Sequence, residues 1–264
     1  MVYVKTIFVM ILILAGGYGL SLGQWKAVDI SVLETFFGAF GTIYAIVIGF
    51  VIFQVLDYYN QLKSHISSEI NAIQNLRDFL AFIDDHDDEV RETLEHIDDY
   101  VASVIEQEWP NMLAEQKTNM DTSVALHQVI KSVNKINPCN QSDIVALEKL
   151  IQTISEISTH RTHRLKESRT NRLPPLLKQL VIILSSFIIL AFTFLPLEDM
   201  VVKVIFSSAM TFAVTLIYFV ILDLDNAYTG SWAVTNDRYK ELLDENRRYI
   251  VSHNEARALA EASS

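Results

Sequence analysis

The side chains best suited to chemistry include a short cluster of histidines and arginines. His160, Arg161, His163 and Arg164 place two imidazoles three residues apart, a spacing that could suggest a metal site. The two guanidinium groups beside them would repel a cation, so we favour a basic patch at anionic lipid headgroups. Such a patch could also concentrate anions near a cytoplasmic mouth. Arg161 and Arg164 are therefore candidate contacts for ions or lipid headgroups.

Acidic residues form two further clusters. The run over residues 84–89 lacks the glycine and the terminal glutamate spacing of an EF-hand, so we interpret it as a solvated turn with helix caps. Asp223 and Asp225 come directly after an apolar segment. They could coordinate a cation or cap the next segment, and the sequence leaves both interpretations open. Any bound metal is likewise left unidentified.

The remaining motifs exclude several classes of function. Cys139 is the only cysteine, which rules out an internal disulfide framework, and no local pattern supplies a base for it. The chain has no Walker loop, no G-x-G-x-x-G and no G-x-S-x-G. A net charge of −11 argues against a general nucleic-acid binder. We expect no enzyme activity, no cofactor and no nucleic-acid partner.

Four apolar segments are the elements that must position these clusters. Half of the 264 residues are hydrophobic and 20% are charged, and the two kinds are segregated along the chain. A spanning helix needs about 20 apolar residues. The candidates are residues 6–25, 35–56, 179–197 and 204–222. A signal peptide is the alternative for the first, but the apolar stretch continues past Ala15 without a clean cleavage site.

Lys and Arg residues predict the orientation of these segments. They are concentrated before the third segment and in the C-terminal tail, whereas the loop over 196–202 has acids and no base. The positive-inside rule then places residues 57–175 and 223–264 in the cytoplasm, and Lys5 places the N-terminus there too. The prediction is an all-α membrane protein with four transmembrane helices in two hairpins and both termini cytoplasmic.

This topology divides the chain into four parts. They are a first transmembrane hairpin (1–56), a cytoplasmic helical region (57–175), a second transmembrane hairpin (176–222) and a cytoplasmic C-terminal segment with a helix (223–264).

Apolar residues recur at three- and four-residue intervals through much of the polar sequence, as in amphipathic helices. The pattern continues from the second apolar segment to Leu80 without Pro or Gly, so we predict one unbroken helix there. Further amphipathic helices are expected over about 90–105, ending near Trp109-Pro110, and over 126–133, 144–157 and 239–250.

Two stripes on the second apolar segment could carry function. Gly38, Gly41, Ala45 and Gly49 line one stripe, where small side chains allow helices to pack closely in a bilayer. That contact could be ordinary packing within one protomer.

A neighbouring stripe holds Thr42, Ile46 and Phe50, and it could face lipid, a partner helix or a pore. No apolar segment carries a charge at mid-bilayer depth, apart from Lys178 near the end of one of them. This argues against a proton-coupled pump or transporter, because such proteins usually keep ionisable groups within the membrane.

Four short motifs, in order, resemble the bacterial bestrophin-like family. Residues 41–51, GTIYAIVIGFV, followed by a polar helix containing Glu69, resemble the start of the family pattern. R-x-x-R-L beginning at Arg161 and L-P-P-L beginning at Leu173 resemble its entry to the third span. D-L-D-x-x-x-x-G beginning at Asp223 resembles the segment after the fourth. The resemblance covers most of residues 35–250.

A more remote similarity is to the bestrophin channels, which are pentamers with four spans per subunit and an apolar neck lined by the second span. The match around Gly49-Phe50 implies that Thr42, Ile46 and Phe50 are the neck residues. Thr42 replaces an apolar residue, Ile46 an aromatic one and Ala45 a serine. The calcium clasp of these channels has no recognisable counterpart beyond residues 223–225.

The resemblance implies a homo-oligomer, a pentamer, that conducts inorganic ions passively across the lipid bilayer of the bacterial inner membrane. The alternative is a non-conducting scaffold or sensor whose cytoplasmic helices bind a partner. Ion selectivity stays open, because the basic patch favours anions and the net acidity of the cytoplasmic region favours cations.

Overall fold

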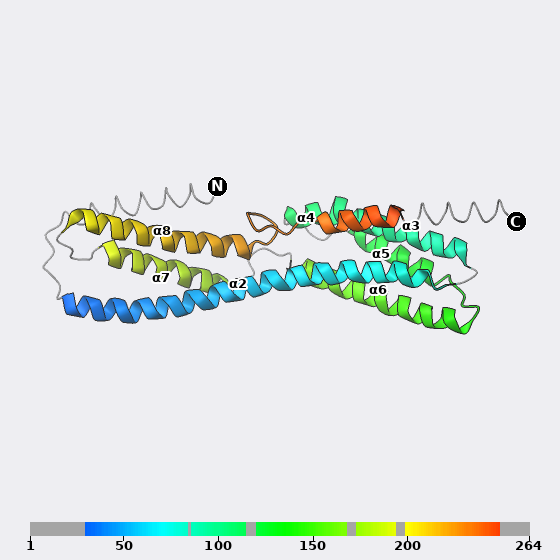
Figure 1. Ribbon diagram of the computed structural model, residues 1–264, viewed down its shortest axis with the longest axis horizontal. Helices are drawn as coiled ribbons and strands as arrows, with labels where there is room; N and C mark the ends of the chain where they lie inside the picture. Colours follow the sequence, from blue (N-terminus) through cyan, green and yellow to red (C-terminus); the bar gives the residue numbers. More distant parts are fainter. Residues whose placement is uncertain (1–29, 84–85, 115–119, 168–172, 194–198, 249–264) are drawn as a thin grey trace. The chain divides into compact units, whose positions relative to one another are not determined.

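The computed structural model describes residues 30–83, 86–114, 120–167, 173–193 and 199–248, and all regular structure in these ranges is helical (Figure 1). The predicted first span, residues 6–25, lies outside the described residues, as do Asp84 and Asp85. The chain divides into two compact units, built from the described parts of 1–59 with 171–232, and of 60–170 with 233–264. Helix α2, Ile30–Leu80, contributes to both units.

The first unit contains three helices that are long and apolar enough to cross a membrane. They are the N-terminal part of α2, α7 (Pro175–Thr193) and α8 (Met200–Asp225). Three of the four predicted apolar segments are thus present as helices. Pro175 begins α7 at a position where its missing N–H costs no helical hydrogen bond. Asp199 caps α8, because its carboxylate accepts hydrogen bonds from the N–H groups of Val201 and Val202.

One face of α2 packs against α7 and α8. Tyr44, Ile48, Val51 and Val55 are buried at intervals of three and four residues, as a helix with 3.6 residues per turn requires. They form one core with buried residues of the two other helices. Those partners are Val181, Ile188 and Ile189 of α7 and Val214, Ile221 and Leu224 of α8.

The second unit is built from several helices around the C-terminal part of α2. In chain order they are α3 (Asp87–Ser103), the π-helical turn η1 (Val104–Glu108), α4 (Trp109–Leu113), α5 (Met120–Val133) and α6 (Gln141–Glu167), followed by a helix over 237–248. The unbroken α2 and the amphipathic helices near 126–133 and 144–157 are confirmed. Asp87, Asp88 and Glu89 form the first turn of α3.

The predicted end of the helix near Trp109-Pro110 is wrong, because the winding continues to Leu113. Proline has no N–H and cannot make the usual bond to the carbonyl four residues earlier. The chain widens into a π turn before Pro110, where the N–H of Trp109 bonds to the carbonyl of Val104. Glu108, the last residue of this turn, and Trp109, the first residue of α4, are both buried.

Candidate pore face and buried ion-pair network

The side of α2 that faces away from α7 and α8 carries exposed apolar residues. Ile46 is 68% exposed and Phe50 is 61% exposed. At 100° per residue, Ile46 lies about 200° around the helix from Tyr44, on the side opposite the core. Thr42 is exposed on the same side, and its hydroxyl donates a 2.8 Å hydrogen bond to the carbonyl of Gly38. None of the three is buried by the described helices.

The stripe of small residues is also open on its outer side. A Cβ atom at Gly38, Gly41 or Gly49 would have no heavy atom within 4 Å among the described residues, leaving aside the helix's own backbone. Ala45 is exposed. The described part of one chain therefore provides no close helix contact here. Packing of this stripe against another copy of the chain stays a prediction.

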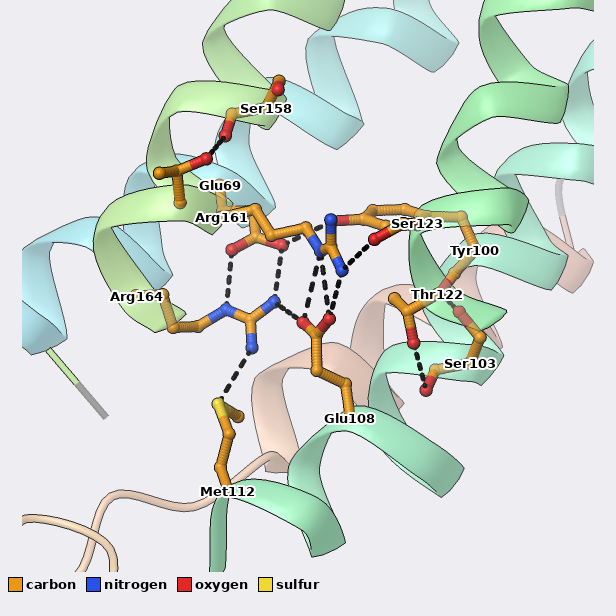
Figure 2. Close-up of polar contacts among 11 residues, drawn as sticks. Glu69, Tyr100, Ser103, Glu108, Met112, Thr122, Ser123, Ser158, Arg161 and Arg164 are labelled. Carbon is orange, nitrogen blue, oxygen red and sulfur yellow. Dashed lines mark hydrogen bonds and ion pairs between the residues drawn. The ribbon is translucent and has the colours of Figure 1, made fainter. Parts of the chain in front are cut away.

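A buried network of charged side chains lies in the second unit (Figure 2). Arg164 of α6 is fully buried and faces Glu69 of α2. Its Nε donates to Oε2 of Glu69 at 2.8 Å, and its Nη2 donates to Oε1 at 3.1 Å. Two parallel bonds between planar groups are the strong form of this pair, so they connect α2 firmly to α6.

Glu108 of the π turn links this pair to a second arginine. Its Oε1 accepts from Nη2 of Arg164 at 2.5 Å, and its Oε2 accepts from Nε of Arg161 at 3.0 Å and from Nη2 at 2.5 Å. The Oγ of Ser123 lies 3.1 Å from Nη2 of Arg161. Two carboxylates thus balance two guanidinium groups, which offsets the cost of removing the four charges from water.

Neutral side chains complete the surroundings of Arg164. The hydroxyl of Tyr100 donates to Oε1 of Glu69 at 2.8 Å. Burial, helped by the Glu69 carboxylate, holds the pKa of Tyr100 well above its usual range, so the phenol remains a donor. The Cζ of Arg164 lies 5.6 Å from the centre of the Tyr239 ring, within reach of a cation–π interaction. Nη1 of Arg164 lies 3.5 Å from the sulfur of Met112.

Comparisons with known proteins agree with this architecture. The model of the bestrophin-like domain matches residues 7–239. The chain belongs to the bestrophin-like family. This confirms the resemblance seen in the short motifs. No curated protein matches the chain in sequence.

Crystal structures of a bacterial bestrophin homologue from Klebsiella pneumoniae share the fold of this bestrophin-like chain. Two mutant forms each match with a TM-score of 0.71, at 11% and 9% sequence identity. The alignments cover 94% and 96% of this chain and 99% of the Klebsiella chains. At such low identity the likeness establishes the fold alone.

The structure of this bestrophin-like chain contradicts the expected lipid contacts of Arg161 and Arg164. Arg161 is 9% exposed and Arg164 is 0% exposed, and both are paired with carboxylates. A lipid headgroup would have to displace those carboxylates from a buried site. The sequence analysis noted Glu69 only as part of a motif and missed Glu108, because these partners lie 95 and 53 or more residues away in the chain.

Asp223 and Asp225 of the bestrophin-like chain lie at the C-terminal end of α8, where both carboxylates accept backbone hydrogen bonds. A contact of either residue with an ion stays a prediction. Asp225 is buried, accepts the N–H of Leu173 at 2.8 Å and pairs with Nζ of Lys178 at 2.5 Å. Asp223 accepts the N–H of Ser231 at 3.0 Å. Gly230 adopts a φ of 107°, and a Cβ atom there would overlap the Asp223 carboxylate.

Two further contacts involve histidines that the sequence analysis did not connect. His65 of α2 meets His160 and His163 of α6. His86 places Nε2 at 3.3 Å from the sulfur of the exposed Cys139. As the side chains stand, the described residues contain no group of three or more His, Cys, Asp or Glu that could hold a metal ion.

Proposed function

We propose that this bestrophin-like protein forms an oligomeric channel that conducts ions passively through a central pore lined by α2. The observation that carries the proposal is the exposed stripe of Thr42, Ile46 and Phe50, which lies on the side of α2 away from α7 and α8. Family membership supplies the second support. In this proposal the apolar stripe of each protomer faces the symmetry axis of the assembly.

The spacing of the stripe suits an apolar gate. Ile46 and Phe50 are four residues apart, which is about 6 Å along the helix axis. In a symmetric oligomer each forms a ring, and the two rings make a hydrophobic collar with Phe50 as the tighter ring. Thr42 adds a more polar ring on the outer side. Water leaves a narrow apolar neck because it loses hydrogen bonds there. An ion without its hydration shell then faces a high free-energy barrier to crossing the neck.

The assembly that we propose is a homo-oligomer, a pentamer, in the bacterial inner membrane, with both termini cytoplasmic. Its partners are the bilayer and inorganic ions. The open stripe of Gly38, Gly41 and Gly49 supports contact between copies, because small residues let neighbouring helices approach closely. The excess of Lys and Arg in residues 57–175 and 223–264, relative to the loop over 196–202, supports the orientation.

Ion flux into liposomes containing the purified oligomer tests this function. Ile46→Ala and Phe50→Ala are expected to widen the collar, favour wetting and raise the flux, whereas Thr42→Ala changes it less. Phe206→Ala is the matched control, because Phe206 is 57% exposed on α8 and is expected to face lipid. Its flux should equal that of the unmodified protein.

Thermal stability measured on the same variants separates a gate from a packed core. Truncation of an exposed residue changes the free energy of unfolding by about 0.5 kcal/mol or less, whereas truncation in a core costs about 2–5 kcal/mol. Destabilised variants with no flux would refute the gate. If neither the unmodified protein nor the collar variants conduct, the channel proposal is refuted. The result would then favour the alternative, a scaffold whose cytoplasmic helices bind a partner.

A further inference from the structure

Three imidazoles from two helices gather in the second unit. Nδ1 of His65 on α2 lies 3.4 Å from Nδ1 of His160 on α6. The ring of His163, one turn further along α6, stacks on the ring of His65 with centroids 4.6 Å apart and planes 7° apart. His65 and His160 are half-buried, whereas His163 is exposed. Neither the buried ion-pair network nor the proposed pore uses these groups.

The sequence-based objection to a cation near these histidines does not hold in the structure. That objection was repulsion from Arg161 and Arg164. Both guanidinium groups are directed into the buried network, where Glu69 and Glu108 neutralise them. In addition, the carboxylate of Glu167 interacts electrostatically with His65. The local charge around the three imidazoles is therefore compatible with a bound cation.

We propose that His65 and His160 bind a transition-metal ion of the Zn²⁺, Ni²⁺ or Cu²⁺ class, with His163 as the third ligand and water completing the coordination. Two nitrogens that each lie about 2.0–2.1 Å from a tetrahedral ion are about 3.3–3.4 Å apart. The two Nδ1 atoms already have this separation. Imidazole nitrogen suits these ions, whereas Mg²⁺ and Ca²⁺ prefer oxygen ligands.

His163 must rotate to complete the site, because its ring is stacked parallel to that of His65, so its nitrogens lie in a different plane from those of His65. Its exposure leaves the side chain free to make this movement. The bound ion would join α2 to α6 one helical turn from Glu69 and Arg164, since His65 and His160 precede these residues by four positions. Binding to the folded state would therefore raise its stability with the logarithm of the metal concentration, once that concentration exceeds the dissociation constant.

Thermal unfolding and titration calorimetry of the full-length oligomer in detergent test the site, with Zn²⁺ as the probe and Mg²⁺ as the comparison. The protein carries Cys139→Ser, which removes the only thiol and its contact with His86. Zn²⁺ is expected to bind at one ion per protomer and raise the melting temperature, with reversal by a chelator. Mg²⁺ should do neither. His65→Gln and His160→Gln each remove a direct ligand. Each should therefore weaken Zn²⁺ binding by no less than the loss of about 10- to 100-fold that is typical when an outer-shell partner is removed.

His127→Gln is the matched control, because His127 is exposed on α5 and takes no part in the cluster. It should retain the Zn²⁺ affinity of the parent. Equal Zn²⁺ binding by the parent, His65→Gln and His160→Gln proteins would overturn the proposal, as would a parent that binds no Zn²⁺. Melting temperatures without metal show that each variant is folded. The absorption spectrum of bound Co²⁺ provides an independent readout, and loss of its ligand-field bands in His163→Gln identifies the third ligand.

Discussion

Glu69→Gln is the sharpest test of the buried network, because it removes one negative charge with almost no change in shape. The Glu69 side chain is fully buried and accepts bonds from Arg164 at two points and from Tyr100. Removing one partner of a buried ion pair costs about 3–5 kcal/mol, because the other charge stays buried without compensation. Two guanidinium groups would then share the single carboxylate of Glu108.

Thermal unfolding of the oligomer in detergent, followed by circular dichroism, measures this cost. One kcal/mol corresponds to about 2–4 °C for a chain of about 150–250 residues, so the expected fall in melting temperature is on the order of 6–20 °C. Glu156→Gln is the control, because Glu156 is exposed on the same helix as Arg164. A surface change of that kind is worth about 0.5 kcal/mol or less.

A double-mutant cycle with Arg164→Met isolates the pair itself. Once Glu69 is neutral, loss of the Arg164 charge is expected to cost much less than it does in the unmodified protein, because the cation no longer has its main partner. A Glu69→Gln protein that melts within the range of the Glu156→Gln control would refute the reasoning. Additive effects of the two changes would refute the pairing.

Three further predictions concern other parts of the chain. Gly230→Ala should destabilise the protein by more than about 1 kcal/mol, because φ there is positive and the new methyl group would overlap Asp223; chemical denaturation measures this. Burial raises the pKa of Asp98, so its protonation favours the folded state, and stability should gain as pH falls through that pKa. Asp98→Asn should remove this gain without loss of stability at neutral pH, as read by melting temperatures between about pH 7 and pH 4. Gly41→Leu and Gly49→Leu should give smaller or heterogeneous species in native mass spectrometry, because added volume separates packed helices.

Each of these three predictions has an outcome that contradicts it. An unchanged denaturation midpoint in Gly230→Ala would mean that the turn can relax around a methyl group. An Asp98→Asn protein with the parent's pH profile would assign that dependence to other carboxyls. Intact oligomers from both leucine variants would show that the stripe of small residues faces lipid or open space.

The helical elements could be predicted from the sequence because each depends on neighbours within a few turns. The periodicity that ends at Leu80 indicated an unbroken α2, and uncharged runs of about 20 residues indicated α7 and α8. The position of a proline predicted the end of a helix less well. Pro110 marked a change in winding and the helix continued beyond it, because a π turn accommodates the missing N–H.

The site was harder to predict because its contacts are distant in sequence. Arg161 and Arg164 read as a surface patch when they are considered with their neighbours alone. Their environment depends on Glu69 and Glu108, which come from two other elements. A sequence shows that a charge is present, but its burial depends on whether an opposite charge is brought within about 3 Å, and that is decided by tertiary packing.

The π turn also sets the angular phase of the helices that it joins. It holds one more residue than an α-helical turn, so everything after it is rotated by about 100° relative to a regular helix. Glu108, the last residue of the turn, and Trp109, the first residue of α4, both face inward. Glu108 reaches the arginines, while Trp109 makes an edge-to-face contact with Tyr239 at 5.9 Å. In the register that follows the extra residue, one short segment supplies a charge and an aromatic ring to the same interior.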